Sequence, residues 1–182
     1  MILLSFVVAG LALGLAKGGS LSGLGNIPFR FSWLIPLGFV AQAIIFSPVF
    51  GSSNLSPFIP AVYLLAHFVL LVAVVLNRHL RPLWVLGLGL VLNLAVMSAN
   101  GGLMPTSPEQ LAISGHGQQS EKLRLEGHVL NAQLLTPETR LAFLGDILAI
   151  PAPIPLSTVF SVGDIFIGLG ALVLVYKSMV AT

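Results

Sequence analysis

The sequence predicts an all-α fold, a polytopic transmembrane helix bundle of about five spans with an amphipathic cap on its outer side. Of the 182 residues, 56% are apolar and only 8% are charged, whereas about a quarter of an ordinary soluble domain is charged. Five apolar stretches approach the roughly 17–25 residues that a membrane helix needs. These observations exclude a soluble enzyme, a disordered chain and a nucleic-acid-binding protein.

The five stretches make residues 1–182 a single membrane domain. The first lacks a basic segment at its start, so we expect a retained span and not a cleaved signal peptide. In the second, Pro36 and Pro48 should kink the helix or fray its ends. The small-residue pairs Gly10/Gly14 and Gly168/Gly170 favour close helix contact. The predicted spans are residues 1–16, 31–50, 58–76, 83–99 and 156–176.

Basic residues predict the orientation. Five of the eight fall on one side of the alternating spans, and the positive-inside rule makes that side cytoplasmic. The N-terminus should then lie outside and the C-terminus in the cytoplasm. All six acidic residues come at or after position 109, toward the outer side. The five basic residues are Lys17, Arg30, Arg78, Arg81 and Lys177.

Residues 100–155 form the predicted extracytoplasmic segment. Ser107-Pro108-Glu109 and Thr136-Pro137-Glu138 each have a hydroxyl N-cap, a proline at the first helical position and a carboxylate in the first turn, which indicates two helix starts. Residues 114–120 are rich in Gly, Ser and Gln and indicate a loop. The proline-rich residues 150–155 should be extended along the membrane surface.

One polar side chain lies near the middle of each of the last four spans, so the bundle should contain a polar layer. Because a polar group buried in lipid needs a partner, two interpretations are open. The layer forms interhelical hydrogen bonds that fix helix register, or it is a proton-handling or ligand site in which Asp164 and His67 share a proton. The four residues are Gln42, His67, Asn93 and Asp164.

Two further groups are candidate sites on the outer side. Asp146 and Asp164 are 18 positions apart across the proline-rich stretch, and two close carboxylates can act as an acid/base pair. Asn100-Gly101-Gly102 is either a helix stop with glycine in the left-handed conformation or a backbone site for an anionic headgroup. We expect no metal site, since cysteine is absent and no histidine has a ligand at metal-binding spacing. No cofactor is clearly implied.

Four motifs carry a resemblance to an uncharacterised bacterial family of small polytopic membrane proteins, domain of unknown function 5317. They are Gly18-Gly19-Ser20-Leu21, Asn100-Gly101-Gly102-Leu103-Met104-Pro105, the run from Thr139 to Asp146, and Phe160-Ser161-Val162-Gly163-Asp164. The resemblance implies a bacterial inner-membrane protein and implies no activity. The last motif, with Asp146, also resembles signal peptidase II, although Ser161 and Gly163 depart from the residues of that family.

Three functions follow as expectations. The first is a non-catalytic small subunit or lipid-contacting stabiliser of a larger membrane assembly, with membrane lipids and other membrane subunits as partners. The second is an outward-facing aspartyl hydrolase that uses Asp146 and Asp164. The third is a proton-coupled or quinone- or lipid-binding membrane protein that uses His67 and Asp164. No nucleic-acid partner is expected.

Overall fold

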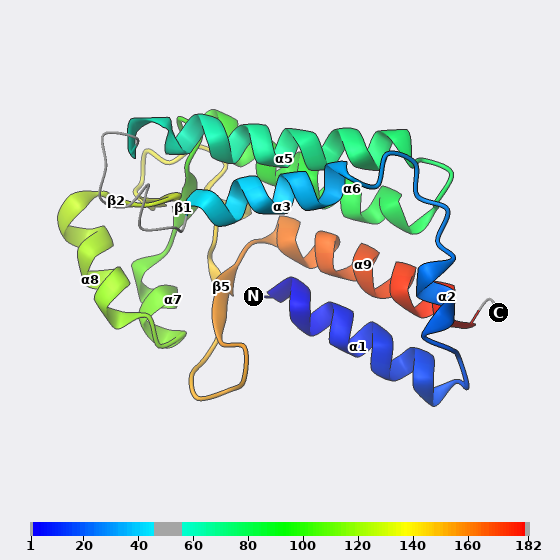
Figure 1. The fold of residues 1–182 in the computed structure, drawn as a ribbon. Coiled ribbons are helices and arrows are strands. Elements are labelled where there is room, and N and C mark those ends of the chain that lie inside the picture. Colours follow the sequence, from blue (N-terminus) through cyan, green and yellow to red (C-terminus); the bar gives the residue numbers. More distant parts are fainter. Residues whose placement is uncertain (1, 46–55, 181–182) are drawn as a thin grey trace.

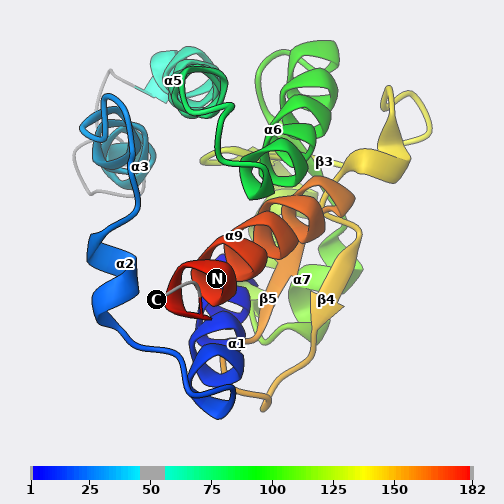
Figure 2. The ribbon, with the colours of Figure 1, turned by 90° about the vertical axis from the view of Figure 1, so that its right-hand side faces the viewer.

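The computed structural model describes residues 2–45 and 56–180, and it is mostly helical. Seen end-on (Figure 2), five long helices follow one another in an open arc, in the order α3, α5, α6, α9, α1. Residues 100–155 gather at one end of this arc (Figure 1). The long helices are α1 (Ile2–Ala16), α3 (Leu34–Ile45), α5 (Ile59–Leu76), α6 (Pro82–Ala99) and α9 (Val162–Val180).

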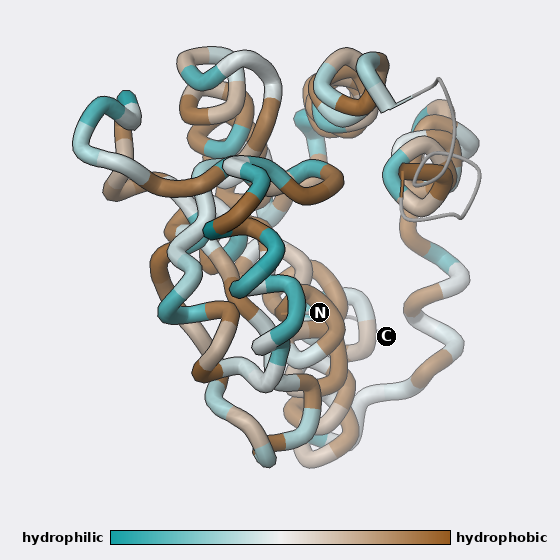
Figure 3. The backbone as a smooth tube through the Cα atoms, turned by 90° about the vertical axis from the view of Figure 1, so that its left-hand side faces the viewer, coloured by the Kyte–Doolittle hydropathy of each residue, from teal (hydrophilic) through white to brown (hydrophobic). Residues whose placement is uncertain are grey.

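Three helices are long and apolar enough to cross a membrane: α6, α9, and α5 together with the 3-10 turn η1 (Ser56–Phe58) that precedes it. The helices α1 and α3 are equally apolar but shorter over the described residues. Large apolar side chains on all five helices are exposed, including Leu65 at 60% and Val8 at 51%. The hydropathy colouring in Figure 3 shows apolar helices behind a more polar outer segment. Such extensive apolar exposure suits a hydrocarbon solvent.

Glycines allow the helices to approach closely. A Cβ at Gly89 on α6 would collide with the carbonyl oxygen of Gly163 on α9, and a Cβ at Gly10 on α1 would lie 2.9 Å from the backbone oxygen of Leu172 on α9. A Cβ at Gly14 would collide with the side chain of Met179, and a Cβ at Gly168 would collide with the ring of Phe6. The predicted close contacts at Gly10/Gly14 and Gly168/Gly170 are therefore confirmed, as small residues at membrane-helix interfaces would produce.

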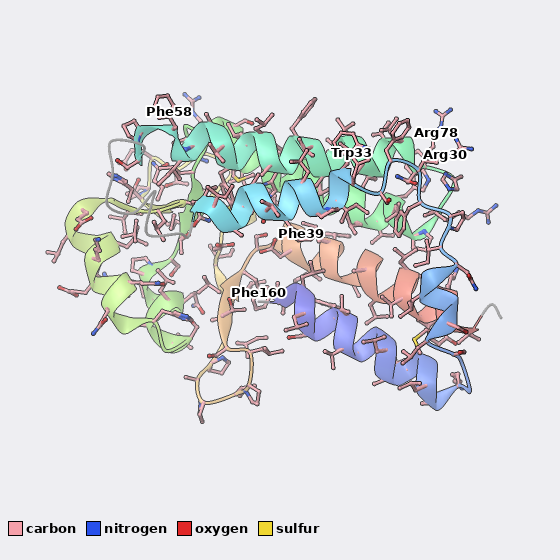
Figure 4. The ribbon with its side chains drawn as sticks, in the orientation of Figure 1. Arg30, Trp33, Phe39, Phe58, Arg78 and Phe160 are labelled. Atoms are coloured by element: carbon pink, nitrogen blue, oxygen red, sulfur yellow. The ribbon has the colours of Figure 1, made fainter. Side chains whose placement is uncertain are left out.

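The end of the bundle opposite the outer segment is held by Asn77. Its fully buried side chain accepts from the N–H of Arg30 and donates to the carbonyl oxygens of Arg30 and Ala73. The short helix α2 (Ser22–Gly25) lies before this connection and packs on the last turn of α9, where Gly23 meets Ser178. Arg30 and Arg78 lie together at this end (Figure 4).

The outer segment contains strands as well as helices, so the prediction of a purely α-helical fold was wrong there. Strand β3 pairs with β1 in parallel and with β2 in antiparallel orientation, while β4 and β5 form an antiparallel pair. The segment is anchored on the outer ends of the long helices, because Met104 and Leu144 pack with Val96 and Met97. The strands are β1 (Met104–Thr106), β2 (His128–Val129), β3 (Ala132–Leu134), β4 (Leu148–Ile150) and β5 (Thr158–Phe160).

One of the two predicted helix starts in the outer segment is confirmed. Ser107 caps α7 (Pro108–Ile113) by accepting from the N–H of Gln110. At the other, Thr139 Oγ1 accepts from the N–H of Thr136 and closes a turn, so the predicted helix is absent there. The chain reaches only the 3-10 turn η2 (Ala142–Leu144).

Helix α8 (Gly117–Glu126) begins inside the predicted loop of residues 114–120, so only the first part of that prediction holds. Both ends of α8 are paired with α7, because Ser120 Oγ donates to the carbonyl oxygen of Pro108 and Arg124 in the last turn pairs with Glu109. Tertiary contacts thus override the local Gly and Gln content.

The helices α1, α5 and α6 begin and end within one residue of the predicted spans. Helix α3 begins three residues after the predicted start, and the predicted end of that span lies outside the described residues. Pro36 occupies the first turn of α3 and produces no kink, since the first turn tolerates proline; Pro48 lies outside the described residues. The predicted last span began at position 156, but residues 158–160 form β5 and α9 begins at Val162. Residues 151–157 are the non-helical tip of the β4–β5 hairpin.

Candidate functional site

The carboxylate of Asp164 caps the start of α9. Its Oδ2 accepts from the N–H of Ser161 at 3.1 Å, and Ser161 Oγ accepts from the N–H of Asp164 at 3.0 Å. This reciprocal pair is a capping box, which satisfies two backbone donors at a helix start. It also explains why α9 starts where it does.

Asn93 on α6 completes this cluster. Its Nδ2 donates to Asp164 Oδ1 at 2.8 Å, and its Oδ1 accepts from Ser161 Oγ at 2.9 Å. Asn93 and Ser161 are 1% and 0% exposed. Both oxygens of Asp164 therefore have protein donors, and two members of the predicted polar layer form a helix-to-helix link.

A cavity of about 520 Å³ lies beside this cluster, within the arc of long helices. This volume falls in the usual range for small-molecule sites, about 300–1,000 Å³. One wall comes from α1 and α9 and the opposite wall from α3 and α5. Phe39, one of the lining residues, lies on the side of α3 that faces α9 (Figure 4). The apolar lining includes Leu3, Val7, Phe29, Ile35, Phe39, Leu70, Val74, Leu83, Leu90, Ile167 and Leu174.

The cavity is long and its polar groups lie toward one end. On α5 its lining runs from Tyr63 to Val74, which is about 16 Å at 1.5 Å per residue. Its polar lining consists of Gln42, Tyr63, His67 and Asp164, and no lysine or arginine occurs among the described residues that line it. The shape and lining suit an extended apolar chain with a polar end.

Three of the four predicted polar-layer residues line this one cavity: Gln42, His67 and Asp164. The fourth, Asn93, reaches it through its hydrogen bond to Asp164. The His67 Nδ1 is 3.0 Å from the carbonyl oxygen of Tyr63 one turn earlier, and the two rings meet edge to face with centroids 4.6 Å apart. Three residues that the sequence placed at one depth therefore lie around the polar part of one cavity.

Asp146 lies just before the β4–β5 hairpin, and the hairpin returns the chain toward Asp164, as the sequence indicated. The backbone of Asp146 is fixed to β1: its N–H donates to the carbonyl oxygen of Pro105 at 2.8 Å, and its carbonyl oxygen accepts from the N–H of Ser107 at 3.0 Å. Its side-chain Oδ1 is buried without a hydrogen-bond partner among the described residues. Burial raises the pKa of the Asp146 carboxyl well above its usual range, and the charge of Asp164 raises it further.

The Asp146 side chain lines a second cavity, of about 290 Å³, between the outer segment and α5. Tyr63 and Val159 line both cavities, so the two adjoin at these residues. The Tyr63 hydroxyl meets the side chain of Asn131, which also lines the second cavity. Other polar lining residues are Thr106, Gln119 and Thr158.

Asn100, Gly101 and Gly102 end α6. Gly101 and Gly102 have φ of 71° and 91°, and the N–H of Gly102 donates to the carbonyl oxygen of Met97, which is the helix-stop interpretation. The Asn100 side chain is engaged with the backbone N–H and carbonyl oxygen of Arg140. Asn100 and Gly102 therefore contact other parts of the protein. Gly101 does not, because a Cβ there would meet no atom of the described residues within 4 Å.

The sequence interpretation missed Tyr63 and Asn131. Tyr63 is one of only two tyrosines in the chain and lies within a long apolar stretch, which marks it as a polar group that needs a partner. Asn131 carries no comparable signal, because its role depends on how the outer segment folds back onto α5. Sequence periodicity does not predict that contact.

Comparisons with known proteins give one match. The chain matches no curated protein and no solved structure, and the likeness to signal peptidase II is accordingly not supported. A family model described as a family of unknown function, DUF5317, matches residues 26–176. This range covers most of the chain, including the polar cluster and nearly all of both cavities. The protein therefore belongs to the DUF5317 family.

Proposed function

We propose that this protein is a non-catalytic integral membrane protein that holds the apolar chain of a membrane amphiphile in the cavity between α1 and α3. The observation that carries the proposal is the cavity itself, which is long, apolar over most of its length and polar at one end. Neighbouring helices pack in the order α3, α5, α6, α9, α1, so the two ends of the arc flank the cavity on the side where lipid would enter.

The proposed setting is the bacterial cytoplasmic membrane, crossed by all five long helices, with the outer segment as an extracytoplasmic cap. In support, α1, α5 and α9 run away from the outer segment and α3 and α6 run toward it (Figure 1). The five basic residues used for orientation follow α1, precede α3, join α5 to α6 or lie in the last turn of α9. The positive-inside rule then makes the outer segment extracytoplasmic, with the N-terminus outside and the C-terminus inside.

A bound lipid would also fit a role in a larger assembly, the first function expected from the sequence. The exposed apolar faces of the long helices suit contact with lipid or with other membrane subunits. The aspartyl hydrolase has weaker support, because both oxygens of Asp164 already accept hydrogen bonds from Ser161 and Asn93. A general acid or base in that position would have to leave its cap.

The proposal is tested by purifying the protein in a mild detergent and quantifying the lipids extracted from it by mass spectrometry. Wild-type protein should retain one amphiphile species at about one per chain. Ala73→Phe, which places a large ring in the cavity lining, should lose it. Ala61→Phe is the matched control on the same helix, because Ala61 is exposed and does not line the cavity.

If wild-type protein yields only a proportional sample of bulk membrane lipid, the proposal is wrong. The same conclusion follows if Ala73→Phe, folded and monodisperse, retains the species as fully as Ala61→Phe. Co-purification of other subunits in fixed ratio would support the assembly role in addition.

A further inference from the structure

We infer that the second cavity, around Asp146 and Tyr63, binds the polar end of the same amphiphile, and that this end is uncharged and carries hydroxyl or carbonyl oxygens. The inference rests on the proposed function and assigns the chemical class of the ligand. Three features of the described residues support it: the junction of the two cavities, the unpaired carboxyl oxygen of Asp146, and the absence of lysine and arginine from the lining of both cavities.

Tyr63 connects the two cavities. Its ring lies edge-on against His67 in the long cavity, while its hydroxyl meets Asn131 in the second. Val159 of β5 lines the same junction. A molecule whose chain fills the long cavity would therefore present its polar end to the outer segment, beside Tyr63.

Asp146, which lines the second cavity, carries a hydrogen-bonding atom without a partner in the described part of the chain. Asp146 Oδ1 is closed off from solvent and has no partner among residues 2–45 and 56–180. A buried polar atom without a partner is destabilising, and rotation of the Asp146 carboxyl toward the cavity would let a ligand oxygen pair with it. The neighbouring polar groups are neutral: the Tyr63 hydroxyl and the amides of Gln119 and Asn131.

The charges in both cavities exclude an anionic headgroup. Among the described residues that line them there is no lysine or arginine, and the carboxylate of Asp164 lines the long cavity. A phosphate there would be desolvated without a cation to pair with it. Burial raises the pKa of the Asp146 carboxyl and so favours its protonated form, which can donate to a hydroxyl or carbonyl oxygen.

The test compares two probes that share one chain, geranylgeraniol and geranylgeranyl monophosphate. The full-length protein in phosphatidylcholine nanodiscs is loaded with radiolabelled geranylgeraniol, and each unlabelled probe is used as competitor. The alcohol should compete at least about tenfold better than the monophosphate. Tyr63→Phe should weaken alcohol binding about five- to tenfold, which corresponds to one lost hydrogen bond.

Variants separate this inference from the proposed function. Tyr176→Phe is the matched control, because Tyr176 lines neither cavity and should leave binding unchanged. Asp146→Leu should abolish the preference for the alcohol over the monophosphate. If Asp146→Leu fails to fold, the loss of alcohol binding in Tyr63→Phe is the test. Equal competition by both probes, with no effect of Tyr63→Phe, overturns the inference and leaves chain binding intact. If neither probe binds and wild-type protein also carries no amphiphile, the proposed function fails as well.

Discussion

Asn93 Nδ2 on α6 donates to Asp164 Oδ1 on α9 at 2.8 Å, so the carboxylate that caps α9 also bonds to the neighbouring helix. The same carboxylate accepts from the N–H of Ser161 through its other oxygen. Asp164 therefore has two structural roles. It accepts from the N–H of Ser161 at the start of α9, and it links α9 to α6 through Asn93.

Replacement of Asp164 by alanine should destabilise the protein by about 1–2 kcal/mol, from about 1 kcal/mol for a lost cap and about 0.6 kcal/mol for a lost interhelical hydrogen bond. Thermal unfolding in detergent measures this loss. Asp164→Asn, which keeps an acceptor oxygen, should lose less. Glu121→Ala, at an exposed position of α8, is the control; an equal loss in that variant would contradict the capping role.

Close packing of α6 on α9 depends on Gly89, beside which a Cβ would collide with the carbonyl oxygen of Gly163. Gly89→Ala should therefore cost about 1–3 kcal/mol, the usual range for overpacking. Gly25→Ala is the matched control, because a Cβ there meets nothing within 4 Å. Comparable melting temperatures for the two variants would show that the helices do not approach as closely as described.

The boundaries of α1, α5 and α6 could be predicted from apolar length, because a membrane helix needs about 17–25 consecutive apolar residues. The start of α9 was predicted six residues too early, since the strand residues Thr158–Phe160 are as apolar as the helix that follows. The capping-box pattern at Ser161 and Asp164 was the available signal, and it was interpreted as chemistry. A polar residue near the start of an apolar helix should therefore be tested as a helix cap before it is assigned to a functional site.

The cavity was only partly predictable for a different reason. The depth of Gln42, His67 and Asp164 in their spans placed them in one layer, and they line one cavity. The second cavity depends on the pairing of β1 with β3 and on the bridge between Thr106 and Asp146. These contacts join segments far apart in the chain, and strands of two or three residues have too few side chains to show a period of two.

Stability should fall as pH rises, because the pKa of Asp146 is raised by burial and by the charge of Asp164. The folded protein then holds a proton that the unfolded chain releases above about pH 4. The stabilisation is complete below the unfolded pKa and is lost as pH approaches the folded pKa. Among the described residues, Asp164 raises the pKa of Asp146, and Tyr63 is the other titratable group that interacts with its charge.

Melting temperatures between pH 5 and pH 8 test this expectation, and Asp146→Asn should flatten the profile. Glu109 contributes a pH dependence of the opposite sign. Its own backbone N–H, Ser107 and Arg124 lower its pKa, so its contribution to stability is lost as pH falls. Its effect is confined to acidic pH and is small because the side chain is exposed. A wild-type profile that rises toward pH 8 would contradict a raised pKa at Asp146.

The orientation can be tested with single cysteines, because the natural chain has none. Gln118→Cys lies at an exposed position of the outer segment, and Asn26→Cys lies at an exposed position near the opposite end. A membrane-impermeant maleimide added to intact cells should label Gln118→Cys and should label Asn26→Cys only after the membrane is opened. The reverse pattern would invert the proposed topology.

The most direct test of amphiphile binding is photocrosslinking with an isoprenoid alcohol that carries a diazirine on its chain, followed by mapping of the modified residues. If the chain lies in the cavity, crosslinks should form at lining residues such as Val7, Phe39 and Ile167 and should be lost in Ala73→Phe. Crosslinks spread over outward-facing residues such as Leu65, Phe68 and Val91, at equal yield in wild type and variant, would show that the chain contacts only the surface of the bundle.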